Sequence, residues 1–246
     1  MIQDDTAEFK QNRNENIQKM NMNSDLQEMT KKWFINSSDY KYSYNFDWLG
    51  MPIIQFPQDI VAIQEVIWRV KPDVIIETGV ARGGSLILSA SILQLLNGNG
   101  KVIGIDIDIR EHNRKAIMEH PLAFRINLIQ GSSIAKDTLE EAKKIIKPTD
   151  KVMVILDSNH THEHVLSELE LYSPLVIKDS YLIVMDTVIE DMPEGYYPDR
   201  PWDKSNNPRT AVHEFLKTND RFKIDEGMHN KLLITVAKDG YLKCIF

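Results

Sequence analysis

The sequence is short of cysteine and of long apolar runs, and both shortages restrict where the protein can work. Its 246 residues include a single cysteine, Cys244, so no disulfide can form within the chain. No apolar run approaches the ~20 residues that a membrane-spanning helix needs. The polar residues at the start lack the apolar core of a signal peptide. We therefore expect a cytoplasmic protein without an integral membrane segment, and the sequence leaves its oligomeric state open, a homo-oligomer included.

Positive charge is also scarce. Lysine and arginine number 29 against 36 acidic residues, and the formal net charge is −7. A nucleic-acid surface needs clustered positive charge, so we expect no nucleic-acid partner. The contents of 42% hydrophobic and 26% charged residues are typical of a globular protein. The length suits one large α/β domain with an extra N-terminal segment, and a small-molecule substrate fits this composition best.

A glycine-rich turn at residues 79–85 is the most informative stretch. It follows a short apolar run that ends at Glu77, and it leads into a helix-like apolar run, residues 86–96. Glycine is needed where φ is positive or where a ligand presses against the backbone. The dinucleotide pattern G-x-G-x-x-G is missing, because the glycines fall at 79, 83 and 84. We interpret the turn as a cofactor cradle, with an ordinary strand-to-helix turn as the alternative.

Strands and helices alternate through most of the chain. Apolar residues spaced by 3.6 predict helices at residues 57–70, 161–172 and from 211 onward. Buried strands are predicted at 74–76, 101–106, 125–130, 152–156 and 181–185, with an antiparallel pair at 221–225 and 232–237. This order predicts a Rossmann-like α/β fold whose seven-stranded, mostly parallel sheet closes with a C-terminal antiparallel hairpin.

Two segments stand apart from this alternation. Residues 1–56 are polar at first and then rich in aromatic side chains, and we assign them to an N-terminal arm or cap, with the main domain at 57–246. The aromatic side chains either pack on the core or form a substrate-binding cap. The loop 187–209 holds four of the ten prolines, together with Tyr196, Tyr197 and Trp202. Loops of this length are usually functional lids or disordered. Its aromatic side chains either contact a substrate or anchor the loop.

Acidic side chains follow several of the predicted strands. Asp106 ends the second strand, where a carboxylate can accept hydrogen bonds from both ribose hydroxyls of an adenosine cofactor. Ser132 follows the third strand, near the expected position of the adenine. Asp157 and Asp186 follow the fourth and fifth strands, and carboxylates at one edge of a sheet suit Mg²⁺. His160, three residues after Asp157, can take a proton from a bound hydroxyl.

Four motifs together make the chain resemble a known family. They are ETGVARGGS, GIDID, the D-x-x-H of residues 157–160, and YLIVMDT. The chain resembles the cephalosporin hydroxylase family of class I proteins that bind S-adenosylmethionine (SAM), which is similar to metal-dependent macrolide sugar O-methyltransferases. The likeness runs from about residue 57 to the C-terminus. It implies a SAM-dependent O-methyltransferase in natural product biosynthesis, acting on a hydroxyl of a sugar or secondary metabolite.

The resemblance also implies roles for individual residues. Asp157 and Asp186 would hold Mg²⁺, and His160 would be the general base. SAM would be bound by Glu77, Gly79, Ala81, Gly83, Ser85, Asp106 and Ser132.

One departure from the family pattern affects the metal site. Relatives carry two successive acids after the fifth strand, whereas this chain has Met185 before Asp186. Water, Glu190 or Asp191 could replace the missing ligand, or the metal site is weaker or lost. His160 and His164 have the i, i+4 spacing of a zinc pair as a further alternative.

Two other functions remain open. A SAM-binding partner without turnover, which assists a hydroxylation, fits the missing acid. An NAD-dependent oxidoreductase shares the ribose acid but predicts the G-x-G-x-x-G turn that this sequence lacks.

Overall fold

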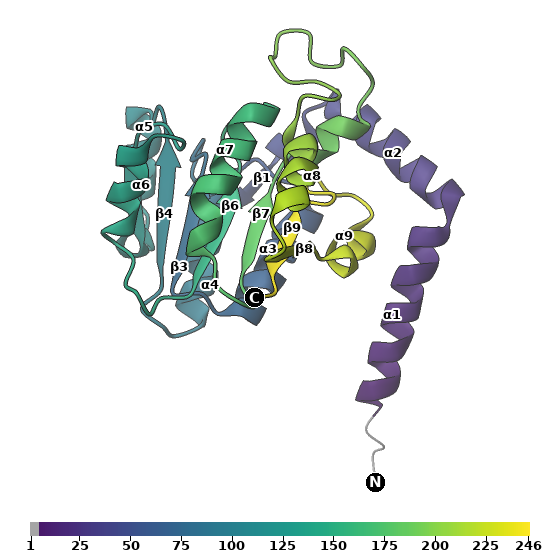
Figure 1. The fold of residues 1–246 in the computed structure, drawn as a ribbon, viewed down its shortest axis with the longest axis horizontal. Helices are drawn as coiled ribbons and strands as arrows, with labels where there is room; N and C mark the ends of the chain where they lie inside the picture. The colour runs from purple at the N-terminus through teal and green to yellow at the C-terminus, as the bar shows by residue number, and fades with distance from the viewer. Residues whose placement is uncertain (1–4) are drawn as a thin grey trace.

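The computed structural model describes residues 5–246, and its centre is a seven-stranded sheet with helices on both faces (Figure 1). The first five strands of the spatial order are parallel, and β9 runs antiparallel to both of its neighbours. This confirms the predicted fold class. The spatial order is β5 (Ile126–Gln130), β4 (Lys101–Asp106), β3 (Val74–Thr78), β6 (Val152–Leu156), β7 (Tyr181–Val184), β9 (Tyr241–Cys244) and β8 (Phe222–Ile224).

The central strands are apolar throughout because both faces of the sheet are covered. All residues of β3 and β6 are buried, which is typical of parallel strands between two helical layers. Ile75 and Met153 belong to one core cluster, while Ile76 and Val154 belong to the other, as alternation along a strand requires. One layer contains α3 (Pro57–Val70), α4 (Gly84–Leu95) and α5 (Glu111–Glu119), and the other α6 (Lys136–Lys143), α7 (His162–Tyr172) and α8 (Pro208–Thr218).

Short 3-10 turns complete the connections. They are η2 (Ala123–Arg125), η3 (Ser173–Leu175) and η4 (Thr187–Asp191). The predicted helices at 57–70 and 161–172 are confirmed, and the last one begins earlier than predicted, at Pro208. Asn207 explains this start, because its side chain caps α8 by accepting from the backbone N–H groups of Arg209 and Thr210.

The predicted strand at residues 232–237 is wrong. α9 (Glu226–Leu232) ends where that strand was predicted to begin, residues 233–237 form a loop, and β8 pairs instead with β9. The physical reason is Asp59 of α3, whose side chain is fully buried. Its carboxylate accepts hydrogen bonds from the Thr235 hydroxyl, from the Val236 N–H at 2.9 Å and from the Tyr241 hydroxyl at 3.2 Å. The Asp59 carboxylate therefore accepts the hydrogen bond of a backbone N–H group that the prediction had placed in a β-ladder.

The N-terminal segment is mostly helical. It contains α1 (Thr6–Met22), α2 (Ser24–Ser38), η1 (Tyr42–Tyr44) and a two-stranded ribbon of β1 (Phe46–Trp48) and β2 (Met51–Ile53). Within the described chain α1 buries no side chain; it extends away from the sheet and contacts α9 (Figure 1). Phe34 stacks on Phe56 with ring centroids 4.9 Å apart. Both rings belong to one buried cluster with Val188 and Met192, so part of the aromatic stretch packs against the body of the protein.

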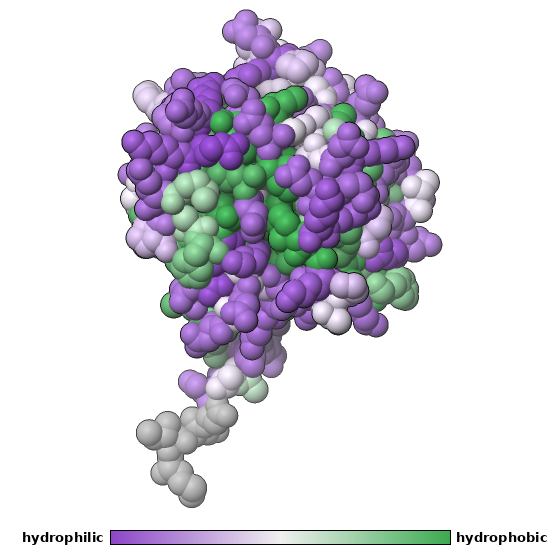
Figure 2. All heavy atoms as spheres, turned by 90° about the vertical axis from the view of Figure 1, so that its left-hand side faces the viewer, coloured by the Kyte–Doolittle hydropathy of each residue, from purple (hydrophilic) through white to green (hydrophobic). Residues whose placement is uncertain are grey.

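The face of the molecule on the side of β5 shows apolar surface in its middle, with polar residues around it (Figure 2). β5 is the edge strand on this side, and Ile107, Phe124 and Ile134 are exposed apolar residues next to its ends. Among residues 5–246, no helix is both long and apolar enough to cross a membrane.

Candidate active site

Two acidic side chains meet at one edge of the sheet because their strands are parallel and in register. Thr78 pairs with Leu156, and Leu156 pairs with Val184, so β3, β6 and β7 end side by side. Asp157 directly follows β6, and Asp186 follows β7 by two residues. The sequence-predicted metal ligands are therefore brought together at the carboxyl end of the sheet, where α/β folds place their sites.

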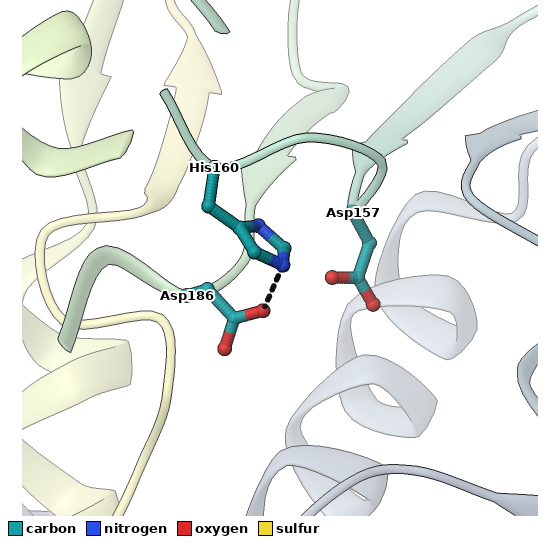
Figure 3. A group of neighbouring side chains, drawn as sticks. All are labelled: Asp157, His160 and Asp186. Atoms are coloured by element: carbon teal, nitrogen blue, oxygen red, sulfur yellow. Dashed lines mark ion pairs between the residues drawn. The ribbon is translucent and has the colours of Figure 1, made fainter. Parts of the chain in front are cut away.

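Asp157, His160 and Asp186 form one cluster. Each offers a potential metal-ligand atom, and these atoms all lie within 4.8 Å of one another. The His160 Nε2 is 3.2 Å from the Asp186 Oδ2, and the Asp157 carboxylate faces the same space (Figure 3). His160 reaches this position from the turn between β6 and α7, while Asp186 adopts a left-handed backbone conformation with φ of 55°. The site thus combines two hard oxygen donors with one imidazole nitrogen.

The electrostatics of the cluster favour a cation. Burial raises the pKa of Asp157 well above its usual range, and the nearby charges of Asp186 and Glu77 raise it further. Two carboxylates this close hold a proton between them unless a positive charge replaces it. A divalent cation would supply that charge, and carboxylate oxygens are the ligands that Mg²⁺ prefers. The residues present therefore fit a magnesium ion.

The missing acid is not replaced by Glu190 or Asp191. Glu190 accepts hydrogen bonds from the Asn207 side chain and from the Ser205 N–H. Asp191 forms ion pairs with Arg209 and Lys238. Met185 itself is 1% exposed and belongs to the hydrophobic core. Within residues 5–246, the third donor of the cluster is therefore His160.

The zinc pair considered for His160 and His164 is wrong. α7 begins at His162, so His160 precedes the helix and shares no helical face with His164. The His164 Nε2 instead lies 3.0 Å from the Ser133 Oγ and 3.2 Å from the Ser158 Oγ.

A cleft of about 150 Å³ lies next to the acidic cluster. Three predicted cofactor residues line it: Gly79, Asp106 and Ser132. Six further residues of the cleft wall were not predicted from the sequence: Ile105, Ile107, Ser133, Ser158, Asn159 and His164. Ile105 lies within a predicted strand and His164 within a predicted helix, while the other four follow predicted strands. None of these positions shows from the sequence which side chains face the cleft.

Asp106 organises the wall of this cleft. Its Oδ2 accepts hydrogen bonds from the Val80 N–H at 2.8 Å and from the Ala81 N–H at 3.3 Å, and its Oδ1 accepts from the Asp108 N–H at 3.0 Å. A carboxylate has about four acceptor positions, so Asp106 keeps capacity for a ribose hydroxyl. It therefore holds the glycine turn in shape and still faces the cleft.

Positive φ, one of the two reasons considered from the sequence, and contacts within the protein explain two glycines of the turn. The other reason was that the glycines leave room for a ligand. Gly79 has φ of 92°, and a Cβ there would collide with the backbone carbonyl of Asp157. Gly83 has φ of 86°, and a Cβ there would collide with the Ile117 side chain. Protein packing and backbone conformation already demand glycine at both positions.

Glu77, Ala81, Gly83 and Ser85 do not line the cleft. Glu77 is 1% exposed, and its Oε1 accepts a hydrogen bond from the Ser85 hydroxyl. Its Oε2 is buried without a hydrogen-bond partner among the described residues. Burial raises the pKa of Glu77 to about 7. A buried carboxylate oxygen without a partner is costly, which makes Glu77 a suitable neighbour for a positively charged ligand group.

The proline-rich loop reaches the acidic cluster through Trp202. The Trp202 ring meets the His160 ring edge to face, with centroids 4.7 Å apart. The Tyr196 hydroxyl donates a hydrogen bond to the Asp39 Oδ1 at 2.9 Å, which ties the loop to the N-terminal segment. Tyr196 therefore anchors the loop, while Trp202 reaches the site.

Comparison with known proteins places the chain in a family. A family model described as Rhamnosyl O-methyltransferase/CmcI matches residues 40–245. A rhamnosyl O-methyltransferase of Mycobacterium tuberculosis is 28% identical over 200 residues, which cover 79% of this chain and 76% of that protein. The resemblance inferred from the four motifs is confirmed.

Solved structures match the fold. An unliganded CmcI structure has a TM-score of 0.59 and 20% identity, covering 82% of this chain and 77% of that chain. An O-methyltransferase from Bacillus cereus, in complex with S-adenosylhomocysteine (SAH), has a TM-score of 0.52 and 17% identity, covering 79% and 81%. At these identities the likeness establishes a shared class I fold.

Proposed function

Because the chain belongs to the Rhamnosyl O-methyltransferase/CmcI family, we propose that it transfers the methyl group of SAM to a hydroxyl of a sugar or secondary metabolite. One observation carries the proposal: the acidic cluster and the cleft are direct neighbours. Gly79 lines the cleft and packs against the Asp157 backbone, and Ser158 and Asn159, which also line the cleft, follow Asp157. A methyl donor in the cleft would therefore lie beside a hydroxyl held at the cluster.

SAM is assigned to the cleft. Asp106 would accept a hydrogen bond from a ribose hydroxyl at its remaining acceptor position, and Ser132 would lie towards the adenine. Glu77 would balance the positive charge of the methionine part through its unpartnered oxygen. Ala81, Gly83 and Ser85 would act indirectly, because they shape the turn or hold Glu77 rather than line the cleft.

Asp157 and Asp186 would hold Mg²⁺, which when bound supplies Lewis-acid activation of the acceptor hydroxyl. His160 is assigned as the general base, taking the hydroxyl proton on Nε2, the nitrogen that faces the cluster. The main contribution of the protein would be alignment of the oxygen with the methyl group. The acceptor would lie under Trp202, and residues 1–56 would serve as the cap that braces the loop through Asp39.

A second role for His160 follows from its position within ligand distance of both carboxylates. As a metal ligand it could not serve as the base. Mg²⁺ titration of His160→Gln separates the two roles, because a base leaves the metal affinity nearly unchanged, whereas a ligand lowers it.

The proposal is tested with SAM that carries a deuterated methyl group, incubated with the protein, Mg²⁺ and a panel of rhamnosides and other glycosides. Mass spectrometry should find the label on a hydroxyl of the acceptor, and excess EDTA should abolish transfer while calorimetry still shows SAM binding. Full turnover in EDTA would remove the metal from the mechanism. SAM binding without transfer to any acceptor would favour the alternative, a SAM-binding partner protein whose metal site is incomplete because Met185 replaces an acid.

A further inference from the structure

Asp59 holds a loop that leads to the acidic cluster. It lies in the first turn of α3 with its side chain fully buried, and its Oδ2 accepts from the Val236 N–H at 2.9 Å. Its Oδ1 accepts from the hydroxyls of Thr235 and Tyr241. The Thr235 Oγ1 in turn accepts from the Ala237 N–H at 3.0 Å. One buried carboxylate therefore fixes a stretch of chain that has no helix or strand of its own.

Val236 joins this loop to the segment that follows β7. While its N–H faces Asp59, its carbonyl accepts from the Val188 N–H at 3.0 Å and from the Thr187 hydroxyl at 3.1 Å. The same hydroxyl lies 2.5 Å from the Lys238 carbonyl, and Thr187 is also fully buried. Two carbonyls of the loop therefore hold the first two residues of η4.

Asp186 comes directly before η4 and depends on how that turn is held. It lies two residues beyond the end of β7, and its φ of 55° is in the left-handed region, which is uncommon for residues other than glycine. Arg209 of α8 holds η4 from the other side, since its Nε donates to the Thr187 carbonyl at 3.1 Å. η4 thus keeps one anchor when the loop contacts are removed, while its placement against the loop is lost.

We propose that Asp59 is a positioning residue that sets the affinity of the acidic cluster for Mg²⁺. It acts through Val236 and Thr187, which fix the Asp186 carboxylate where it faces the other two donor side chains. Removing a residue that orients a metal ligand commonly lowers the metal affinity by about 10- to 100-fold. The inference rests on the proposed function, which assigns Mg²⁺ to this cluster.

Calorimetric titration with Mg²⁺ measures the affinity without turnover. It is done at pH 8, because burial raises the pKa of Asp59 to about 6 and the carboxylate is then ionised. Asp59→Ala should lower the Mg²⁺ affinity by about 10-fold, since Val236 loses its partner. Asp59→Asn should keep it within about 3-fold, because the amide still accepts from Val236 and the two hydroxyls can turn to accept from its NH₂ group.

Two further variants separate this role from general stabilisation. Tyr241→Phe is the matched control: it removes a hydrogen bond from the same carboxylate but lies on β9, so it should lower the thermal midpoint and keep the Mg²⁺ affinity. Thr187→Val keeps the shape of the side chain without its hydroxyl and should weaken Mg²⁺ binding by about 3- to 10-fold. Adding it to Asp59→Ala should cost less than about 2-fold more, because the two contacts act in series.

An unchanged Mg²⁺ affinity in Asp59→Ala overturns the inference. So does an equal loss in Tyr241→Phe, because that indicates a general loosening of the core. If Asp59→Ala does not fold, Thr235→Val replaces it, since it removes one hydrogen bond between the loop and Asp59 and should weaken Mg²⁺ binding by about 3-fold or more. These outcomes overturn this inference alone, whereas an unaltered protein that binds no Mg²⁺ overturns the metal assignment of the proposed function as well.

Discussion

Replacing Glu77 by glutamine should stabilise the cofactor-free protein above neutral pH and weaken SAM binding. Glu77 is buried, one of its oxygens accepts from Ser85, and the other has no partner within residues 5–246. Burial raises its pKa from an ordinary value of 4.5 to about 7. Glutamine keeps the shape and an acceptor for Ser85 but carries no charge. The cost of ionising the buried group should therefore disappear.

The sign and size of the effect follow from this shift. Between the two pKa values the folded protein binds more protons at Glu77 than the unfolded chain does, so stability falls as the pH rises through this window. With these pKa values, ionisation of Glu77 lowers the free energy of unfolding by roughly 0.8 kcal/mol at pH 5 and by roughly 3.3 kcal/mol at pH 8. The stability gain of Glu77→Gln should therefore be about 2.5 kcal/mol larger at pH 8 than at pH 5.

Urea denaturation of the cofactor-free protein at both pH values measures this difference. Glu141→Gln, an exposed change on α6, is the control and should show no such dependence. Calorimetry at pH 8 should show SAM binding weakened by about 10-fold or more in Glu77→Gln, because a charged partner is lost. A gain that is the same at pH 5 and pH 8 would refute the reasoning. Unchanged SAM affinity would remove Glu77 from the cofactor site.

Three further substitutions test other parts of the site. His160→Ala should lower kcat by about 10²–10⁴ while SAM affinity in calorimetry stays the same, and a near-normal rate would exclude His160 as the base. Asp106→Ala should weaken SAM binding by about 10- to 100-fold, through the lost ribose contacts and a loosened glycine turn; unchanged affinity would make the ribose assignment wrong. Gly79→Ala should lower the thermal midpoint even without SAM, because the collision is with the Asp157 backbone, and an unaltered midpoint would contradict that contact.

Much of the architecture is local in origin and was therefore predictable. Buried parallel strands need unbroken apolar runs, and such runs stand in the sequence at β3, β4, β6 and β7. The edge strand β5 is only partly buried and contains Asn127. An acid placed at the end of a parallel strand must lie at the carboxyl edge of the sheet. For this reason Asp157 and Asp186 could be assigned to one site before their separation was known, and the nearby His160 could be joined to them.

Other features depend on contacts between distant residues, which no local pattern records. Asp59 and Thr235 are 176 positions apart, and their contact keeps residues 232–237 out of the sheet. The apolar run at residues 232–237 therefore predicts a strand, because the sequence does not show its contact with Asp59.

The same distinction between local sequence pattern and contacts of distant residues applies to the site. The sequence by itself determined which strands carry acids, because periodicity and residue type are properties of short segments. Only the tertiary structure decided that Gly79 packs against Asp157, that Met185 turns into the core, and that His164 contacts Ser133 and Ser158. The direction of a side chain at the end of a strand depends on the loops and helices packed around it, and these come from separate parts of the chain.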